Sequence, residues 1–137
     1  MPDACEKQVS LCFLRNGEKI LLYLRDDKPG IGHPNHWALL GGQIEVGESP
    51  QVALEREIQE EVGCKASNIS FVCQLDVLNN PLCEDHTIFL FKGDMDHGLQ
   101  DMHLTEGQDL GYFTADEFRA LKFADFLRNV ILENIKL

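Results

Sequence analysis

The segment over residues 50–62 constrains the fold more than any other part of the chain. Ser49 is a favoured helix N-cap residue, Pro50 suits the first helical position, and Gly63 suits the residue after the last turn. These boundaries predict a helix over 50–62. Its apolar residues form one stripe that must be buried against another element, such as a β-sheet; they are Leu54, Ile58 and Val62.

Three carboxylates lie beside this apolar stripe. At helical spacing, Glu57, Glu60 and Glu61 fall within an arc of about 100°. Crowded carboxylates repel one another, and Arg56 is the one cation adjacent to them on this face. Mg²⁺ and Mn²⁺ prefer oxygen ligands and bridge carboxylates to phosphates, so the cluster indicates half of a metal–diphosphate site. Taken alone, the cluster also fits a merely solvated helix face.

Strands are predicted on both sides of this helix. Residues 7–25 fit a hairpin with a turn at Asn16-Gly17, and a Pro- and Gly-rich loop follows over 26–36. A short strand over 37–40 should end at Gly41-Gly42. Further strands are predicted over 68–78, 86–92 and 109–113, with helices over 115–121 and 124–135. This order predicts an α+β sandwich in a single domain over 1–137.

The charge balance restricts the partners. Twelve Lys and Arg against 23 Asp and Glu give a formal net charge of −11, which disfavours nucleic acid. A phosphate-bearing substrate would also be repelled unless divalent cations lay between it and the protein. No apolar run is long enough to span a membrane, no leader segment is evident, and the five cysteines show no CxxC pair. We therefore expect free thiols in the cytoplasm and no membrane partner.

The spacing over residues 42–64 resembles the Nudix box of MutT-like hydrolases, G-x5-E-x7-R-E-U-x-E-E-x-G-U, in which U is aliphatic. The matching residues, in register, are Gly42, Glu48, Arg56, Glu57, Ile58, Glu60, Glu61 and Gly63. Only the last position departs, where Cys64 replaces an aliphatic residue; a buried Cys is a small apolar side chain, so we interpret it as a packing variant.

The resemblance implies a Nudix α/β/α sandwich with a mixed β-sheet between helices. It further implies water attack on one phosphorus of a nucleoside diphosphate-linked substrate, assisted by Mg²⁺ or Mn²⁺. By the same resemblance Glu57 and Glu61 are the principal metal ligands, with contributions from Glu60 and the backbone carbonyl of Gly41. Arg56 would orient the glutamates, and Glu48 would brace the loop before the helix.

Outside the box, the general base and the substrate contacts stay open. The base varies between family members, and Glu57 is one candidate. Glu106 matches a loop position at which some relatives keep a carboxylate as base or as an extra metal ligand. Arg25 and His36 are candidate substrate contacts in or beside the loop over 26–36. Trp37 is a third, although an aromatic residue entering a strand more often packs in the core.

Other functions fit the resemblance less well. A Nudix-fold module that senses a nucleotide without catalysis is the alternative, but the box is intact and no second region for DNA binding is evident. A prenyl diphosphate isomerase would need residues outside the box that nothing here marks. The substrate among small nucleotide-type diphosphates is left open, as is a homodimer.

Overall fold

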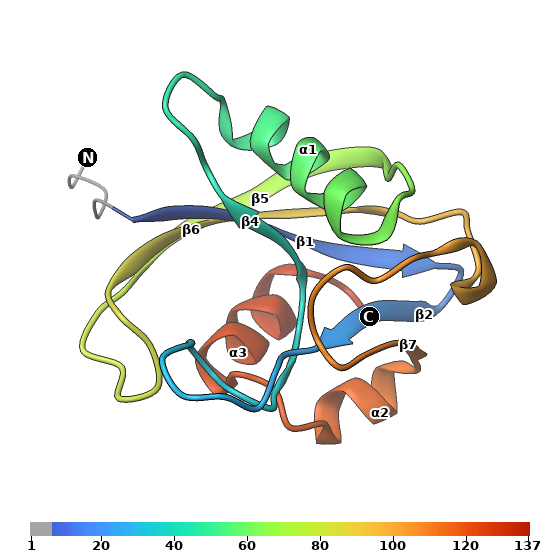
Figure 1. Ribbon diagram of the computed structural model, residues 1–137. Helices are drawn as coiled ribbons and strands as arrows, with labels where there is room; N and C mark the ends of the chain where they lie inside the picture. Colours follow the sequence, from blue (N-terminus) through green and yellow to red (C-terminus); the bar gives the residue numbers. More distant parts are fainter. Residues whose placement is uncertain (1–6) are drawn as a thin grey trace.

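A mixed β-sheet separates two helical layers in the computed structural model, which describes residues 7–137 (Figure 1). One layer holds a single long helix, α1 (Pro50–Val62). The other holds α2 (Ala115–Ala120) and α3 (Asp125–Asn134), and a 3-10 turn, η1 (Leu99–Asp101), precedes the last strand. The predicted α/β/α sandwich is therefore confirmed.

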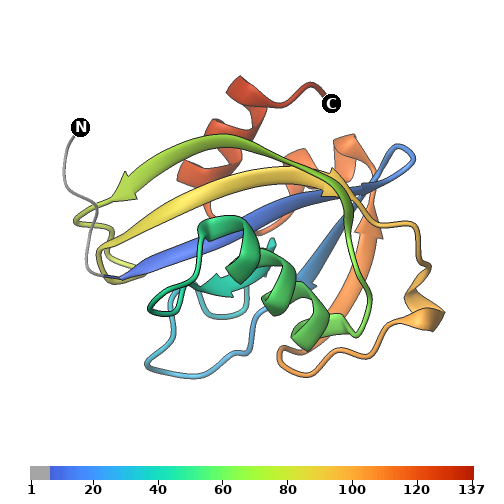
Figure 2. The same cartoon turned by 90° about the horizontal axis from the view of Figure 1, so that it is seen from above.

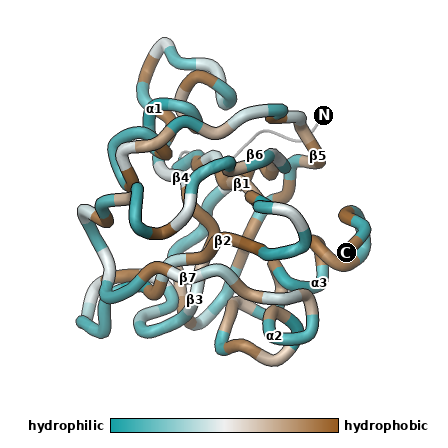
Figure 3. The backbone as a smooth tube through the Cα atoms, turned by 90° about the vertical axis from the view of Figure 1, so that its right-hand side faces the viewer, coloured by the Kyte–Doolittle hydropathy of each residue, from teal (hydrophilic) through white to brown (hydrophobic). Residues whose placement is uncertain are grey.

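The sheet is built around its first strand. In residues 7–137 seven strands form one sheet with the order β3-β2-β1-β6-β5, while β4 pairs with β1 and β7 pairs with β2. Their bounds are β1 (Gln8–Asn16), β2 (Lys19–Leu24), β3 (Trp37–Ala38), β4 (Leu40–Gln43), β5 (Ser67–Val77), β6 (His86–Asp94) and β7 (Asp109–Phe113). Only β1 and β6 run parallel. In Figure 3 the central strand β2 is largely hydrophobic, whereas the outer loops are mostly hydrophilic.

The sheet opens where β1 changes partner. The C-terminal part of β1 pairs with β2, from Leu14 opposite Leu21. Its N-terminal part pairs with β4, up to Cys12 opposite Leu40. The end of β2 and the start of β4 therefore lie on either side of this change of partner, and both contribute to the wall of one cavity, Tyr23 from β2 and Gly41 and Gly42 from β4.

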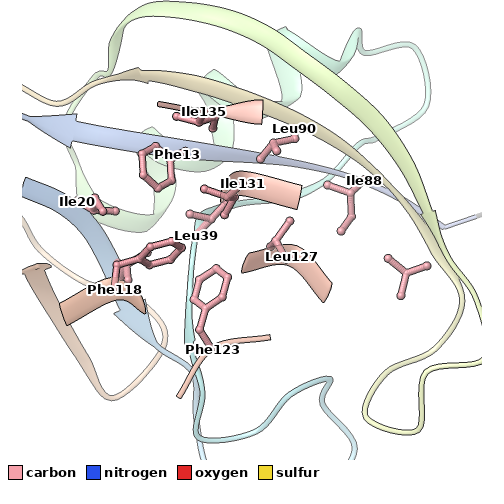
Figure 4. Packing of buried hydrophobic residues seen from close by; sticks show 12 residues of the cluster. Phe13, Ile20, Leu39, Ile88, Leu90, Phe118, Phe123, Leu127, Ile131 and Ile135 are labelled. Atoms are coloured by element: carbon pink, nitrogen blue, oxygen red, sulfur yellow. The ribbon is translucent and has the colours of Figure 1, made fainter. Parts of the chain in front are cut away.

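Both faces of the sheet are covered, by two separate cores. On the α1 side, the predicted stripe of Leu54, Ile58 and Val62 is buried, and Cys64 joins it with 8% of its surface exposed. Cys64 thus packs as expected. On the other side, Phe118 and residues of α3 meet the sheet at Phe13 (Figure 4).

The helix boundaries follow the caps expected from the sequence. The hydroxyl of Ser49 accepts the amide of Val52 at 3.2 Å, and Gly63 adopts the left-handed conformation after α1 with φ +75°. The predicted capping box of α2 is also present, between Thr114 and Glu117.

The expected strand end at Gly41-Gly42 is wrong. The chain breaks at Leu39 and then resumes as β4, which runs through both glycines. Gly41 has φ +146°, and a Cβ there would lie 2.0 Å from the carbonyl oxygen of Ser10. Glycine is therefore present because β4 approaches β1 too closely for any side chain, so this pair continues the sheet and does not break it.

The four cysteines within residues 7–137 are free thiols, as expected, and Cys5 lies outside the described residues. None of the helices in the described part of the chain is long and apolar enough to cross a membrane.

Candidate active site

Arg56 is the centre of the ion-pair network at the start of α1. Its Nε and Nη2 donate to the two carboxylate oxygens of Glu48 at 2.7 and 2.8 Å, in a bidentate pair. Glu48 also accepts the amide of Glu45, so it connects the loop before α1 to the helix. The Arg56 guanidinium holds the pKa of Glu48 down to about 2. This geometry is the bracing arrangement expected for Glu48.

Arg56 also holds two of the three clustered carboxylates. Its Nη1 donates to Glu57 at 3.0 Å and to Glu60 at 3.2 Å. Glu60 is the more exposed of the two, with 58% of its side chain accessible against 21% for Glu57. Burial is the main cause that raises the pKa of Glu57, and the pairing with Arg56 opposes it. Arg56 thus contacts both Glu57 and Glu60, and its role in orienting them for metal binding stays a prediction.

Glu61 has a different environment from its two neighbours. Among residues 7–137 it forms no ion pair with Lys, Arg or His. Its Oε1 accepts the backbone amide of Gly41 at 2.9 Å. Burial, together with the charges of Glu57 and Glu106, raises the pKa of Glu61 to about 8, against the opposing effect of this hydrogen bond.

Glu57 and Glu61 lie over consecutive residues of β4. The carboxylate of Glu61 meets the amide of Gly41, and that of Glu57 covers Gly42, where an added Cβ would lie 2.5 Å from Glu57 Oε2. Glycine at position 42 therefore leaves room for the Glu57 carboxylate. Because β4 crosses beneath α1, carboxylates one helical turn apart reach the same short stretch of backbone.

The carboxylates do not form a ready-made metal cage. Within the described part of the chain, no three Asp, Glu, His or Cys side chains converge tightly enough to hold an ion. Arg56 draws Glu57 and Glu60 to one side, while Gly41 fixes Glu61. The donor set still fits a hard divalent cation, because Glu61 is a largely desolvated carboxylate without a cationic partner and the charge of Glu57 acts on it.

The loop over 102–108 brings Glu106 beside the end of α1. The amides of His103 and Thr105 donate to the carbonyls of Val62 and Glu61 at 3.0 and 3.1 Å, so the loop follows the last turn of the helix (Figure 2). Glu106 is exposed, and its charge acts on Glu61. A carboxylate from this loop can therefore reach the same region as the α1 cluster.

A cavity of about 670 Å³ lies on the other side of the Gly41-Gly42 backbone from these carboxylates, none of which is among its lining residues. Gly41 and Gly42 form part of its wall, and its interior is mainly apolar, with residues from the sheet facing residues of α3. Two loops close it from the outside: the one over 26–36 and the one over 78–85, which are joined by the amide of His33 donating to the carbonyl of Leu82 at 2.9 Å. The acidic site thus adjoins a space that can hold an uncharged, partly planar group.

The three candidate substrate contacts lie differently around this cavity. Arg25 and Trp37 line it, and Trp37 also packs edge-on against Phe113 with ring centroids 4.7 Å apart. His36 is not among the lining residues, because its ring turns to the carbonyl of Pro34. His33, the other histidine of the same loop, lines the cavity and contacts Phe126 of α3.

Sequence reasoning missed Tyr23. It is on β2 beside Arg25, lines the cavity and lies close to the α1 carboxylates. The available signal was its alternation with Arg25 on a strand that leads into the loop over 26–36, since residues i and i+2 share a face.

Comparison with known proteins identifies the family. The model of the NUDIX domain matches residues 6–133, nearly the whole chain. The chain belongs to the Nudix family. Its nucleotide-processing relatives match over shorter stretches: nucleoside triphosphatase NudI of Escherichia fergusonii is 46% identical over 50 residues, covering 36% of this chain and 34% of that protein.

One further relative is similar in sequence and another in structure. Nudix hydrolase 26, a chloroplastic protein of Arabidopsis thaliana, is 32% identical over 68 residues, which cover 50% of this chain and 29% of that protein. The matches therefore span only about a third of the length of these curated relatives. The crystal structure of a MutT NUDIX hydrolase from Burkholderia pseudomallei superposes with a TM-score of 0.76 at 20% identity, over 95% of this chain and 98% of that one, which shows the same fold.

Proposed function

We propose that this Nudix protein hydrolyses a phosphoanhydride bond in a small nucleotide-type diphosphate with the help of Mg²⁺ or Mn²⁺. The observation that carries the proposal is the position of Glu57 and Glu61 over Gly41-Gly42, in the wall of the cavity. Acidic groups and an apolar space thus adjoin, as a substrate with a charged diphosphate and a less polar nucleoside requires.

Glu57 and Glu61 would hold the metal, with Glu60 and the carbonyl of Gly41 as further ligands. A bound divalent cation would neutralise the diphosphate, polarise the P–O bond and acidify the attacking water. Arg56 keeps Glu57 and Glu60 oriented through the contacts described above, and Glu48 fixes Arg56 in turn. The acidic protein would otherwise repel its own substrate, which is the physical reason for requiring the cation.

In the reaction, a water oxygen bonds to one phosphorus while the bridging P–O bond breaks. The proton of the water passes to a carboxylate, and the bridging oxygen leaves with one of the two phosphate products. Glu57 and Glu106 are the two candidate bases: Glu57 is half-buried in the carboxylate cluster, whereas Glu106 is exposed on a loop beside Glu61. Both can reach the region where the diphosphate must lie.

The cavity would take the nucleoside part of the substrate. Arg25 and Trp37 line it, so a guanidinium and an aromatic ring are available for phosphate and base contacts. The name of the relative NudI, a nucleoside triphosphatase, favours a nucleotide over other diphosphates. A cytoplasmic location and a homodimer remain sequence-based predictions.

The test is a phosphate-release screen over nucleoside triphosphates, nucleoside diphosphate sugars and dinucleoside polyphosphates, each with Mg²⁺ and with Mn²⁺. We expect turnover of at least one class, complete loss after exhaustive EDTA treatment, and recovery when Mg²⁺ is restored. Undiminished turnover in EDTA would remove the metal from the mechanism, and no turnover on any member would contradict the proposed activity.

A further inference from the structure

Tyr23 occupies the junction between the acidic site and the apolar cavity. It lines the cavity together with Arg25, Gly41 and Gly42, and its ring packs against the core beneath α1. Tyr23 lines the cavity and the charge of Glu61 acts on it, so a substrate with its diphosphate at the carboxylates and its nucleoside in the cavity would lie beside this residue.

The Tyr23 hydroxyl accepts one hydrogen bond and donates none among residues 7–137. Arg25 Nη1 donates to the Tyr23 oxygen at 3.0 Å, so the oxygen acts as acceptor. A phenol also has one proton to donate, and among residues 7–137 the Tyr23 hydroxyl donates no hydrogen bond. Arg25 is itself held by a second bond, from its Nε to the carbonyl of Gly32 at 2.6 Å, which fixes the guanidinium against the hydroxyl.

The Tyr23 hydroxyl lies near two carboxylates, those of Glu61 and Glu106. The charges of Glu61 and Glu106 both act on Tyr23, as does that of Arg25. A carboxylate that holds a cation is ionised and has no proton to donate to a phosphate oxygen. The Tyr23 hydroxyl and the Arg25 guanidinium are therefore two side-chain donors that this part of the cavity wall offers to a diphosphate.

We infer that Tyr23 is a substrate-binding residue: its hydroxyl accepts a hydrogen bond from Arg25 and donates its own proton to a non-bridging phosphate oxygen of the substrate. This inference rests on the proposed function, because it assumes a diphosphate at the α1 carboxylates. Arg25 also makes the hydroxyl a better donor, since a hydrogen bond accepted from a cation polarises the O–H bond.

The experiment compares Tyr23→Phe with the wild-type protein in calorimetric titrations with inorganic pyrophosphate in the presence of Mg²⁺. Phe keeps the ring and its packing and removes only the hydroxyl. A hydrogen bond to a charged group corresponds to a loss of about 10- to 100-fold in affinity. In hydrolysis assays KM should rise by a similar factor while kcat changes little.

Tyr112→Phe is the matched control, because that hydroxyl donates to the carbonyl of His97 at 2.6 Å, away from the cavity. It should leave pyrophosphate affinity unchanged, and melting temperatures of both variants report on folding. Wild-type affinity in Tyr23→Phe, or no binding of pyrophosphate by the wild-type protein, overturns the inference.

A double-mutant cycle distinguishes two roles of Tyr23: donating a hydrogen bond to the phosphate itself, or only holding Arg25 in position. If Tyr23 contacts the phosphate, Tyr23→Phe should also weaken binding in an Arg25→Met background. If the loss disappears there, Tyr23 acts only through Arg25 and the inference is wrong. Since the titration reports binding of pyrophosphate and does not depend on turnover, a Tyr23-dependent affinity in a protein that hydrolyses no member of the substrate screen would leave this inference standing and contradict the proposed activity alone.

Discussion

At the scale of single residues, the three glutamates of the α1 cluster differ in what compensates their charge. Glu57 and Glu60 share Arg56, whereas Glu61 has the amide of Gly41 and no cationic partner in the described chain. The sequence places all three on one helix face but does not show this difference, because it depends on β4 crossing under the helix. Of the three carboxylates, Glu61 is thus the one that forms no ion pair within residues 7–137.

Glu61 should make the metal-free protein less stable as the pH rises. The pKa of Glu61 is about 8 in the folded state against 4.5 for a solvent-exposed glutamate, so the folded state holds the proton more tightly than the unfolded state. The contribution of Glu61 to the free energy of unfolding is therefore fully present below about pH 4.5 and is lost as the pH rises towards 8. The loss is on the order of 2 kcal/mol after allowance for solvent contact.

Chemical denaturation in EDTA at pH 5, 6, 7 and 8 measures this effect. The Glu61→Gln protein should lose less stability than the wild type across the range. Glu55→Gln is the control, since Glu55 is an exposed residue of the same helix and should keep the wild-type slope. Equal slopes in the wild type and Glu61→Gln would show that Glu61 titrates like a solvated carboxylate.

At the scale of elements, β4 positions the site, and it can do so because of Gly41. The strand pairs with β1 at a separation that excludes a side chain, and its next residue receives the Glu57 carboxylate. Gly41 and Gly42, for which the sequence predicts a strand end, therefore allow the close contact between the sheet and α1. Glycine marks close backbone approach as well as strand ends, and the sequence alone does not separate the two.

Gly41→Ala should therefore be strongly destabilising. The new Cβ would meet the carbonyl oxygen of Ser10 at 2.0 Å, and φ +146° adds backbone strain. We expect a loss of about 3 kcal/mol or more in the free energy of unfolding, measured by urea denaturation.

Gly47→Ala provides the comparison for Gly41→Ala. Gly47 also has positive φ, +85°, but nothing lies within 4 Å of a Cβ there. Gly47→Ala should lower the free energy of unfolding by about 1 kcal/mol, from backbone strain alone. If the two variants lose equal stability, the close approach of β4 to β1 does not govern this part of the fold.

At the scale of the whole molecule, the elements and the acidic half of the site were predictable, and the cavity was not. The helix over 50–62 and its carboxylates follow from local periodicity and caps. The cavity depends on contacts between distant segments, such as His33 with Leu82 and the loop beside α3. The sequence therefore does not show that His33 and Tyr23 line the cavity and that His36 does not, and a role for His36 in substrate binding stays a prediction.

The central claim is that Glu57 and Glu61 hold the metal on which catalysis depends, and kcat with Mg²⁺ for Glu57→Gln, Glu61→Gln and Glu55→Gln tests it most directly. Gln keeps the shape but removes the charge, so the first two should each lose at least about 10³-fold in kcat with the fold retained. Glu55→Gln, on an exposed part of the same helix, should keep the wild-type rate. Near-wild-type kcat in both Glu57→Gln and Glu61→Gln would contradict the account.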